Sequence, residues 1–407
     1  MLALLALWFS RYWYGEIISP LSVFVGINSI SLAFYHLNLL DMYDVSFLTQ
    51  SVVLCGLAAF VVGILVPSGI PYQRSTKALS HKVVTRGLGT FFYVTGLIST
   101  IGWVMPLRLL MQKYSADYLY QNLWILQDEF QMQFIGYLNL FGVLILPTFV
   151  IKWLLRDKRF VDLVLVCSAL FGLLLAGIKS YFLISITTTI LAFAVVRPGR
   201  IRIHHVAIMT VLVLGFFVLY DRMIDIFVAD SFQDTSFPAW MNFLQRPYIY
   251  LVGSWPSLEQ IVRGDMVSQV VWGQVTLQPI WKILGDGLGL VEPIPAFLPF
   301  VDIGVSNFNV FSFIGEVYWD YGLLGVIIMS FSMGFWVTWL YLRTRYHPSW
   351  VNILLYTLFA YGLSISFFAY YFQLKLILLS FYVLFFGMIV KKKLLPTLHT
   401  LRKYDTC

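Results

Sequence analysis

Long apolar runs, each about as long as a helix that crosses a bilayer, recur along most of this chain. A hydrocarbon core about 30 Å thick needs about 20 consecutive apolar residues per helix. Ten runs meet this description, near residues 20–40, 46–66, 87–109, 133–151, 161–178, 180–196, 203–228, 322–342, 350–370 and 374–390. A shorter apolar segment covers residues 1–10. The pattern predicts an all-α, polytopic membrane bundle of about 10–11 transmembrane helices, forming a single membrane-embedded domain over residues 1–407.

Charge and cysteine content narrow the class of protein further. Only 12% of the 407 residues are charged, whereas a soluble domain carries about 25%. Most of the surface must therefore face lipid, and a soluble or secreted enzyme is excluded. Cys55 and Cys167 lie inside apolar runs and Cys407 ends the chain, so no disulfide or metal framework is expected. Residues 1–9 lack the basic region and cleavage site of a signal peptide.

The distribution of Lys and Arg predicts the orientation in the membrane. Alternate connections hold 19 of the 27 basic residues and only four acids, Glu16, Asp157, Asp162 and Asp405. Because cytoplasmic loops retain Lys and Arg, these connections and the C-terminus are expected to be cytoplasmic. The basic runs, Lys152 among them, are interpreted as anchors beside anionic lipid. Nucleic acid is not an expected partner.

The opposite side carries one connection, residues 229–305, that is far longer than the others. Connections of this length are usually functional or folded. Pro247–Arg263 is interpreted as a helix packed along the membrane surface, and Trp240, Trp255, Trp272 and Trp281 as typical of interfacial anchors. We therefore expect the working face of the protein on this outer side.

Eight basic residues remain on the outer side, where the topology does not account for them: Arg108, Lys113, Lys179, Arg222, Arg246, Arg263, Lys282 and Lys375. Arg binds phosphate oxygens bidentately and Lys supplies a point charge, so several together suit a lipid diphosphate. Lys179 lies between two apolar spans, where a charge usually has a partner. The structural alternatives are a snorkelling Lys179 and an Arg246 paired with Asp230 or Asp234.

Glu316 and Asp320 are the strongest acidic candidates. They are four residues apart just before the span at 322, so a helix would place both carboxylates on one face. Such a pair suits a base that orients or deprotonates a hydroxyl. The alternative is a structural ion pair with Arg246 or Lys179. Glu259 is a third, weaker candidate.

Other kinds of chemistry have no support in the sequence. No outward His, Cys or Asp cluster has metal-ligand spacing, and Gly285–Gly289 lacks the Lys of a nucleotide-binding loop. Only His36, of the six histidines, falls on the outer side. The sequence predicts no metal and no cofactor.

Several passages together resemble the Wzy-type oligosaccharide repeat-unit polymerases, which build O-antigen and capsule chains. The resemblance covers nearly the whole chain through the order of its spans. The residues that carry it lie in the following passages: Ser19–Phe24, Tyr35–Leu37, Phe47–Thr49, Gly177–Ser180, and Asn307–Gly325 with its Tyr-Trp-Asp-Tyr-Gly-Leu-Leu-Gly. Lys179 stands where the family tends to have Arg. The long loop does not align, so Arg246 rests on position and chemistry.

The resemblance implies an inverting, metal-independent glycosyltransferase of the membrane-embedded C-type superfamily. It would act at the outer face of a bacterial inner membrane, on undecaprenyl diphosphate-linked oligosaccharides as donor and acceptor. A chain-length regulator and a flippase are the implied protein partners. We assign catalytic roles to Arg246, Lys179, Glu316 and Asp320. The residues expected to contact substrate are Arg222, Arg263, Tyr248, Glu259, Asn307, Asn309, Tyr318, His36 and Lys375.

Two other functions stay open. An O-antigen ligase shares the lipid donor and the large loop. Resemblance to the ligase family would imply a His on the periplasmic side, and residues 229–305 contain none. A lipid-linked oligosaccharide flippase would usually show paired repeats and broken helices, neither of which is visible in the sequence.

Overall fold

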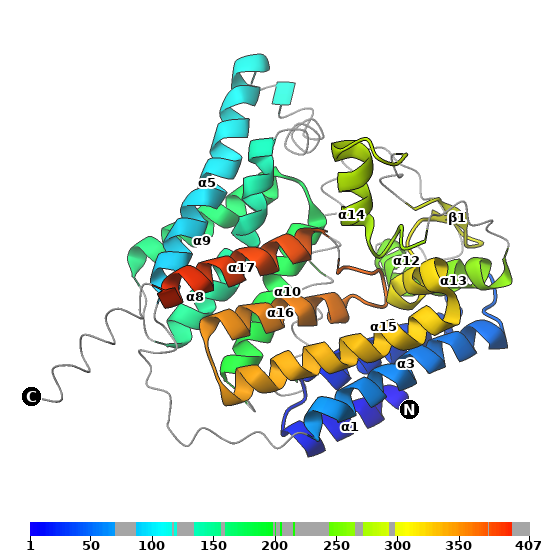
Figure 1. Cartoon of the computed structure of the whole chain (residues 1–407). Helices are drawn as coiled ribbons and strands as arrows, with labels where there is room; N and C mark the ends of the chain where they lie inside the picture. The colour runs from blue at the N-terminus through cyan, green and yellow to red at the C-terminus, as the bar shows by residue number, and fades with distance from the viewer. Residues whose placement is uncertain are drawn as a thin grey trace, which may run out of the picture. The chain divides into compact units, whose positions relative to one another are not determined.

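The computed structural model describes residues 1–69, 87–115, 118–119, 134–155, 159–197, 200, 204–205, 215, 244–264, 272–292, 298–372 and 374–392. These residues are predominantly helical (Figure 1). They divide into two compact units, each assembled from three separate stretches of the chain. The expectation of one domain over the whole chain stays a prediction.

Unit 1 comprises residues 1–72, 198–342 and 359–376. Its elements are α1 (Leu2–Tyr14), α2 (Ile27–Tyr35), α3 (Phe47–Ser68), α12 (Gln245–Val252), α13 (Ser254–Arg263), α14 (Gln278–Lys282), β1 (Val301–Asp302), β2 (Asn307–Phe308), α15 (Ser312–Tyr346) up to Leu342, and α16 (Trp350–Ser364) from Phe359. The core includes Phe24, which stacks on Phe60 of α3 at 4.1 Å and meets Phe313 of α15 edge-on at 5.6 Å.

The close approach of α3 and α15 depends on glycines (Figure 1). A Cβ at Gly63 would overlap the carbonyl oxygen of Phe331, and one at Gly334 would overlap that of Phe60. Small residues of this kind let helix backbones touch, which is the usual basis of helix packing in membranes.

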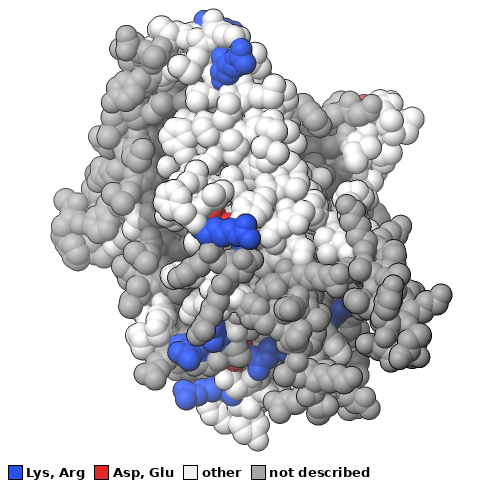
Figure 2. Space-filling view, turned by 90° about the vertical axis from the view of Figure 1, so that its left-hand side faces the viewer, with Lys and Arg blue, Asp and Glu red and all other residues white. Residues whose placement is uncertain are grey.

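Unit 2 comprises residues 73–197, 343–358 and 377–407. Its elements are α5 (Leu88–Lys113), a 3₁₀ segment (Phe134–Leu144) that runs into α8 (Ile145–Leu154), α9 (Phe160–Leu175), α10 (Lys179–Val196), the start of α16, and α17 (Leu374–Lys392) from Ile377. On the face shown in Figure 2, most of the described surface is uncharged, and the charged side chains in view are mainly Lys and Arg.

Lys152 in unit 2 differs from the expectation. It is 1% exposed, and its Nζ lies 2.9 Å from both carboxylate oxygens of Asp162. The ammonium group also lies 4.6 Å from the ring centres of Phe92 and Tyr93. The interpretation of Lys152 as a lipid-facing anchor is therefore wrong, because a buried ion pair joins α8 to α9 there.

Within the described residues, four helices are long and apolar enough to cross a membrane: Phe47–Ser68, Leu88–Lys113, Ile135–Leu154 and Ser312–Tyr346. Five shorter apolar helices cover Ser22–Tyr35, Phe160–Leu175, Ser180–Val196, Trp350–Ser364 and Lys375–Val390. The predicted span 203–228 falls almost entirely outside the described residues. The helical character is thus confirmed and these candidate spans agree with a membrane protein, whereas the count of about 10–11 transmembrane helices stays a prediction. One addition to the all-α prediction is the antiparallel pairing of β1 with β2, in the register Val301 with Phe308.

The segment Pro247–Arg263 is helical, as predicted, but it is not a surface helix. It forms α12 and α13, which meet at Gly253, a residue with helical φ −62° and ψ −21°. The first six residues of α13 are buried, and Trp255 is fully so, with its Nε1 donating to Ser31 Oγ at 2.8 Å. This tryptophan is a core residue of unit 1 rather than an interfacial anchor.

Candidate functional site

The first three turns of α15 carry the candidate site, and a glycine separates them from the rest of the helix. Gly322 has φ 64° and ψ −162°, a conformation that is essentially restricted to glycine. The segment from Ser312 to Tyr321 therefore has an axis of its own. It is also fixed at its start, where the N–H groups of Ser312 and Phe313 donate to the carbonyls of Phe368 (2.9 Å) and Ser366 (2.7 Å).

Glu316 lies on this segment as a buried carboxyl group with one free oxygen. Its residue is 3% exposed. The N–H of Tyr370 donates to Oε1 at 3.1 Å, while Oε2 has no hydrogen-bond partner among the described residues. An unsatisfied buried acceptor costs about 1–3 kcal/mol. A group kept in this state is a candidate for contact with a ligand.

Trp319, three residues after Glu316, has the complementary property. Its Nε1 is buried and has no hydrogen-bond partner within the described part of the chain. Its ring is held edge-on by Phe311 at 5.2 Å. Residues three apart are neighbours on a helix surface. Among the described residues the segment thus has an unused acceptor and an unused donor at neighbouring helix positions, and a hydroxyl group could satisfy both.

Asp320 differs from Glu316 because both of its oxygens are occupied. The N–H of Val275 donates to Oδ1 at 3.2 Å, and the N–H and hydroxyl of Thr276 both donate to Oδ2 at 2.7 Å. Thr276 Oγ1 also lies 2.7 Å from the hydroxyl of Tyr321. Asp320 therefore fixes the turn at residues 272–277 against α15. Neither Glu316 nor Asp320 forms an ion pair with a cation of the described residues, so the alternative of a structural pair with Arg246 is wrong.

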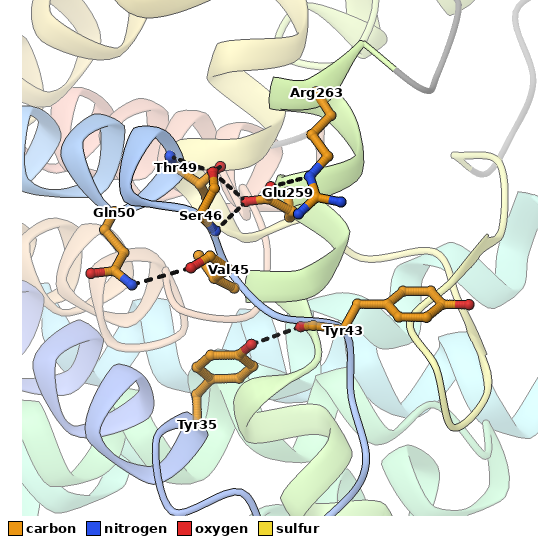
Figure 3. Close-up of polar contacts among 8 residues, drawn as sticks. All are labelled: Tyr35, Tyr43, Val45, Ser46, Thr49, Gln50, Glu259 and Arg263. Atoms are coloured by element: carbon orange, nitrogen blue, oxygen red, sulfur yellow. Dashed lines mark hydrogen bonds and ion pairs between the residues drawn. The ribbon is translucent and has the colours of Figure 1, made fainter.

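Glu259 connects α13 to the beginning of α3 (Figure 3). Its Oε2 accepts from the N–H of Ser46 at 2.8 Å and from the Ser46 hydroxyl at 2.9 Å, and Arg263 Nε donates to Oε1. Ser46 is the N-cap of α3. Burial opposes ionisation of Glu259, but hydrogen bonds from Thr49, Ser46 and Arg263 outweigh it and hold the pKa of the carboxyl below its ordinary value. The contacts of Glu259 are those of an anchor.

The other predicted contact residues of unit 1 differ in exposure. Tyr248 is buried, and its hydroxyl donates to the carbonyl of Phe34 at 2.8 Å and accepts from the N–H of Leu39. The remaining ones are exposed or half-buried: His36, Arg246, Arg263, Asn307, Asn309, Tyr318 and Lys375. All of these belong to unit 1 together with Glu316.

The structure does not place two predicted cations relative to this group. Lys179 is the first residue of α10, in unit 2, and its side chain lies outside what the structure describes. Arg222 lies outside the described residues. Both stay predictions.

Four residues of the site were not found from the sequence: Trp272, Thr276, Tyr321 and Tyr370. Thr276 and Tyr370 lie 44 and 54 positions from the carboxylates that they contact, and no local pattern marks them. In the sequence, Tyr321 stands out only as part of the passage Asn307–Gly325, and Trp272 only as an aromatic residue typical of interfacial anchors.

No three His, Cys, Asp or Glu side chains of the described residues are grouped so that they could hold a metal ion. No protein-family model, curated protein or solved structure matches this chain.

Proposed function

We propose that this protein is a membrane-embedded, inverting glycosyltransferase that polymerises lipid-linked oligosaccharides. The growing glycan would pass as a block from undecaprenyl diphosphate to the next lipid-linked repeat unit. The transfer would take place at the outer face of a bacterial inner membrane and would need no metal. The helix bundle would belong to the membrane-embedded C-type superfamily of glycosyltransferases. The observation that carries the proposal is that Glu316 Oε2 and Trp319 Nε1, three residues apart at the start of an apolar helix, are both buried and both lack a hydrogen-bond partner among the described residues. The resemblance of residues 307–325 to the repeat-unit polymerases supports it.

The proposed reaction uses Glu316 as the general base. A sugar hydroxyl of the acceptor attacks the anomeric carbon of the donor glycan, and a new C–O bond forms on the face opposite the diphosphate. The bond from that carbon to the diphosphate oxygen breaks, and undecaprenyl diphosphate leaves with the electron pair. The hydroxyl proton passes to Oε2 of Glu316. Trp319 Nε1 would donate a hydrogen bond to the acceptor sugar and so help to orient it.

Outward cations would stabilise the leaving diphosphate. Arg246 and Arg263 belong to the same unit as Glu316, and the side chain of Arg263 is 55% exposed. Charge stabilisation by fixed Arg and Lys groups replaces a metal in this scheme. Lys179 and Arg222 are proposed for the same role on sequence grounds alone. Asp320 is proposed as a positioning residue that holds the 272–277 turn.

Purified protein in nanodiscs, supplied with lipid-linked repeat units, tests the proposal. We expect a ladder of polymer lengths, and a rate lower by about 10²–10⁴-fold for Glu316→Gln, because a general base contributes that much. Glu316→Asp should retain part of the activity. Glu292→Gln, which changes an exposed carboxylate, is the matched control and should leave the ladder unchanged.

The alternative functions give different products in the same assay. Transfer to a lipid A core without any ladder would identify a ligase. Translocation of the substrate across vesicles without transfer would identify a flippase. A full ladder from Glu316→Gln would remove Glu316 from the mechanism while leaving the polymerase intact.

A further inference from the structure

A group of large apolar side chains is exposed on a part of unit 1 that does not span the membrane. We call it the loop patch; its members are Trp272, Leu277, Ile280, Ile283, Leu288 and Leu290. Their exposed fractions run from 37% for Leu277 to 70% for Trp272. Soluble surfaces rarely expose large apolar patches, so six exposed large apolar side chains within residues 272–290 are expected to have a partner.

The loop patch lies on a folded segment and not on an open strand of chain. Residues 278–282 form α14, and the next five residues continue as a π-helical turn. The N–H of Leu288 donates to the carbonyl of Ile283 at 2.9 Å, and that of Leu290 to the carbonyl of Leu284 at 2.8 Å. Within unit 1, α14 runs across the direction of α15 (Figure 1). If α15 spans the membrane, this orientation makes α14 roughly parallel to the membrane plane.

The loop patch continues the lipid-facing surface of α15. The Trp272 ring meets Tyr321 edge-on at 4.9 Å. Tyr321 directly precedes Gly322, and beyond that break α15 exposes Leu323 (43%) and Leu324 (68%). These two leucines lie on a helix that is long and apolar enough to cross a membrane. The apolar surface of the span therefore passes through Tyr321 onto Trp272 and the turn that Asp320 fixes.

We propose that the loop patch inserts into the boundary between lipid headgroups and acyl chains, with Trp272 as its anchor. Tryptophan at the end of a span is typical of this depth, and apolar faces that lie in the membrane plane bind there. Continuity with the surface of α15 makes lipid the occupant, in preference to a protein partner. The inference does not depend on the proposed reaction. It moves the membrane contact of the long connection from residues 247–263, which are largely buried, to residues 272–290.

Spin labels at single cysteines test the insertion in full-length protein in nanodiscs. The background carries Cys55→Ser, Cys167→Ser and Cys407→Ser. A single cysteine is then introduced by Ile283→Cys or Leu290→Cys, and the spin label is attached to it. We expect the ratio of collisions with O₂ to collisions with a water-soluble nickel chelate to be roughly threefold or more above that at Asn307→Cys, because O₂ partitions into apolar surroundings and the chelate does not. Leu324→Cys is the lipid-facing reference, and only variants that elute like the parent protein are compared.

Two results would overturn the proposal. A ratio at Ile283 and Leu290 equal to that at Asn307 would mean that the patch faces water. Protection from both reagents would mean that a protein surface, such as a second copy of this chain, covers it.

A second measurement needs no substitution. A phospholipid with a photoreactive group in its upper acyl chain is activated in nanodiscs with the unmodified protein, and the crosslinked peptides are identified by mass spectrometry. Crosslinks within residues 272–290 and 323–328, with none in residues 301–309, are expected. Crosslinks at 323–328 without any at 272–290 would contradict the proposal.

Discussion

At the scale of single residues, the two carboxylates at the start of α15 differ in how many of their oxygens accept hydrogen bonds. Asp320 uses both oxygens on the 275–276 backbone and the Thr276 hydroxyl, whereas one oxygen of Glu316 has no hydrogen-bond partner among the described residues. Their spacing in the sequence alone makes the two carboxylates equivalent candidates for a general base. The difference arises because Asp320 faces a turn whose N–H groups donate to it, while Glu316 receives one hydrogen bond, from Tyr370, within the described part of the chain.

Glu259 makes the stability of unit 1 dependent on pH. Its pKa is lowered in the folded protein from the ordinary 4.5, so its contribution is complete above pH 4.5 and is lost as pH falls through the lower, folded pKa. We expect Glu259→Gln to lower the free energy of unfolding by about 1–3 kcal/mol at pH 7, and the difference from wild type to shrink below about pH 4.

Thermal unfolding in detergent between pH 7 and pH 3 measures this dependence. Glu292→Gln removes an exposed carboxylate and serves as the control. A Glu259→Gln deficit that stays constant down to pH 3 would show that the anchor does not depend on the charge.

At the scale of elements, the α3–α15 crossing is the most sensitive contact of unit 1. Gly63→Val would place side-chain atoms where the Phe331 carbonyl lies. We expect a loss of at least about 1–3 kcal/mol, since overpacking of a tight contact costs that much. Gly89→Ala, at a helical glycine with no neighbouring atom within 4 Å, should be neutral. Thermal unfolding of the two purified variants compares them, and equal midpoints would mean that α3 and α15 do not approach this closely.

At the scale of the whole molecule, the apolar runs predict the helices well and the contacts between them poorly. The runs at 46–66 and 87–109 correspond to α3 and α5 within a few residues, because length and hydropathy are local properties. The contacts of Trp255 with Ser31, of Glu259 with Ser46 and of Glu316 with Tyr370 join positions 54 to 224 apart. The sequence does not show these contacts. From the sequence alone, Pro247–Arg263 is therefore predicted as a surface helix, and Glu316 and Asp320 are equivalent candidates.

The distribution of Lys and Arg also makes a prediction at this scale. In the cysteine-free background, Glu292→Cys should react with a membrane-impermeant maleimide in intact cells, and Arg197→Cys only after permeabilisation, because basic connections are retained in the cytoplasm. Both positions are exposed. The reverse labelling pattern would invert the topology and would place Glu316 near the cytoplasmic face.

The break at Gly322 has a mechanical consequence. A continuous helix would transmit any tilt of its lipid-embedded part to Glu316, and spanning helices tilt when bilayer thickness changes. With a break between them, residues 323–346 can adjust to the bilayer while residues 312–321 keep the position that Ser366, Phe368 and Tyr370 impose. The polymerase activity proposed above is therefore expected to be nearly constant for the wild type in nanodiscs of different acyl-chain length. Gly322→Ala should make it depend on that length, because alanine at this φ and ψ costs about 1–3 kcal/mol and favours a continuous helix. A wild-type rate that follows acyl-chain length as steeply as that of the variant would mean that Gly322 does not isolate the site from the thickness of the membrane.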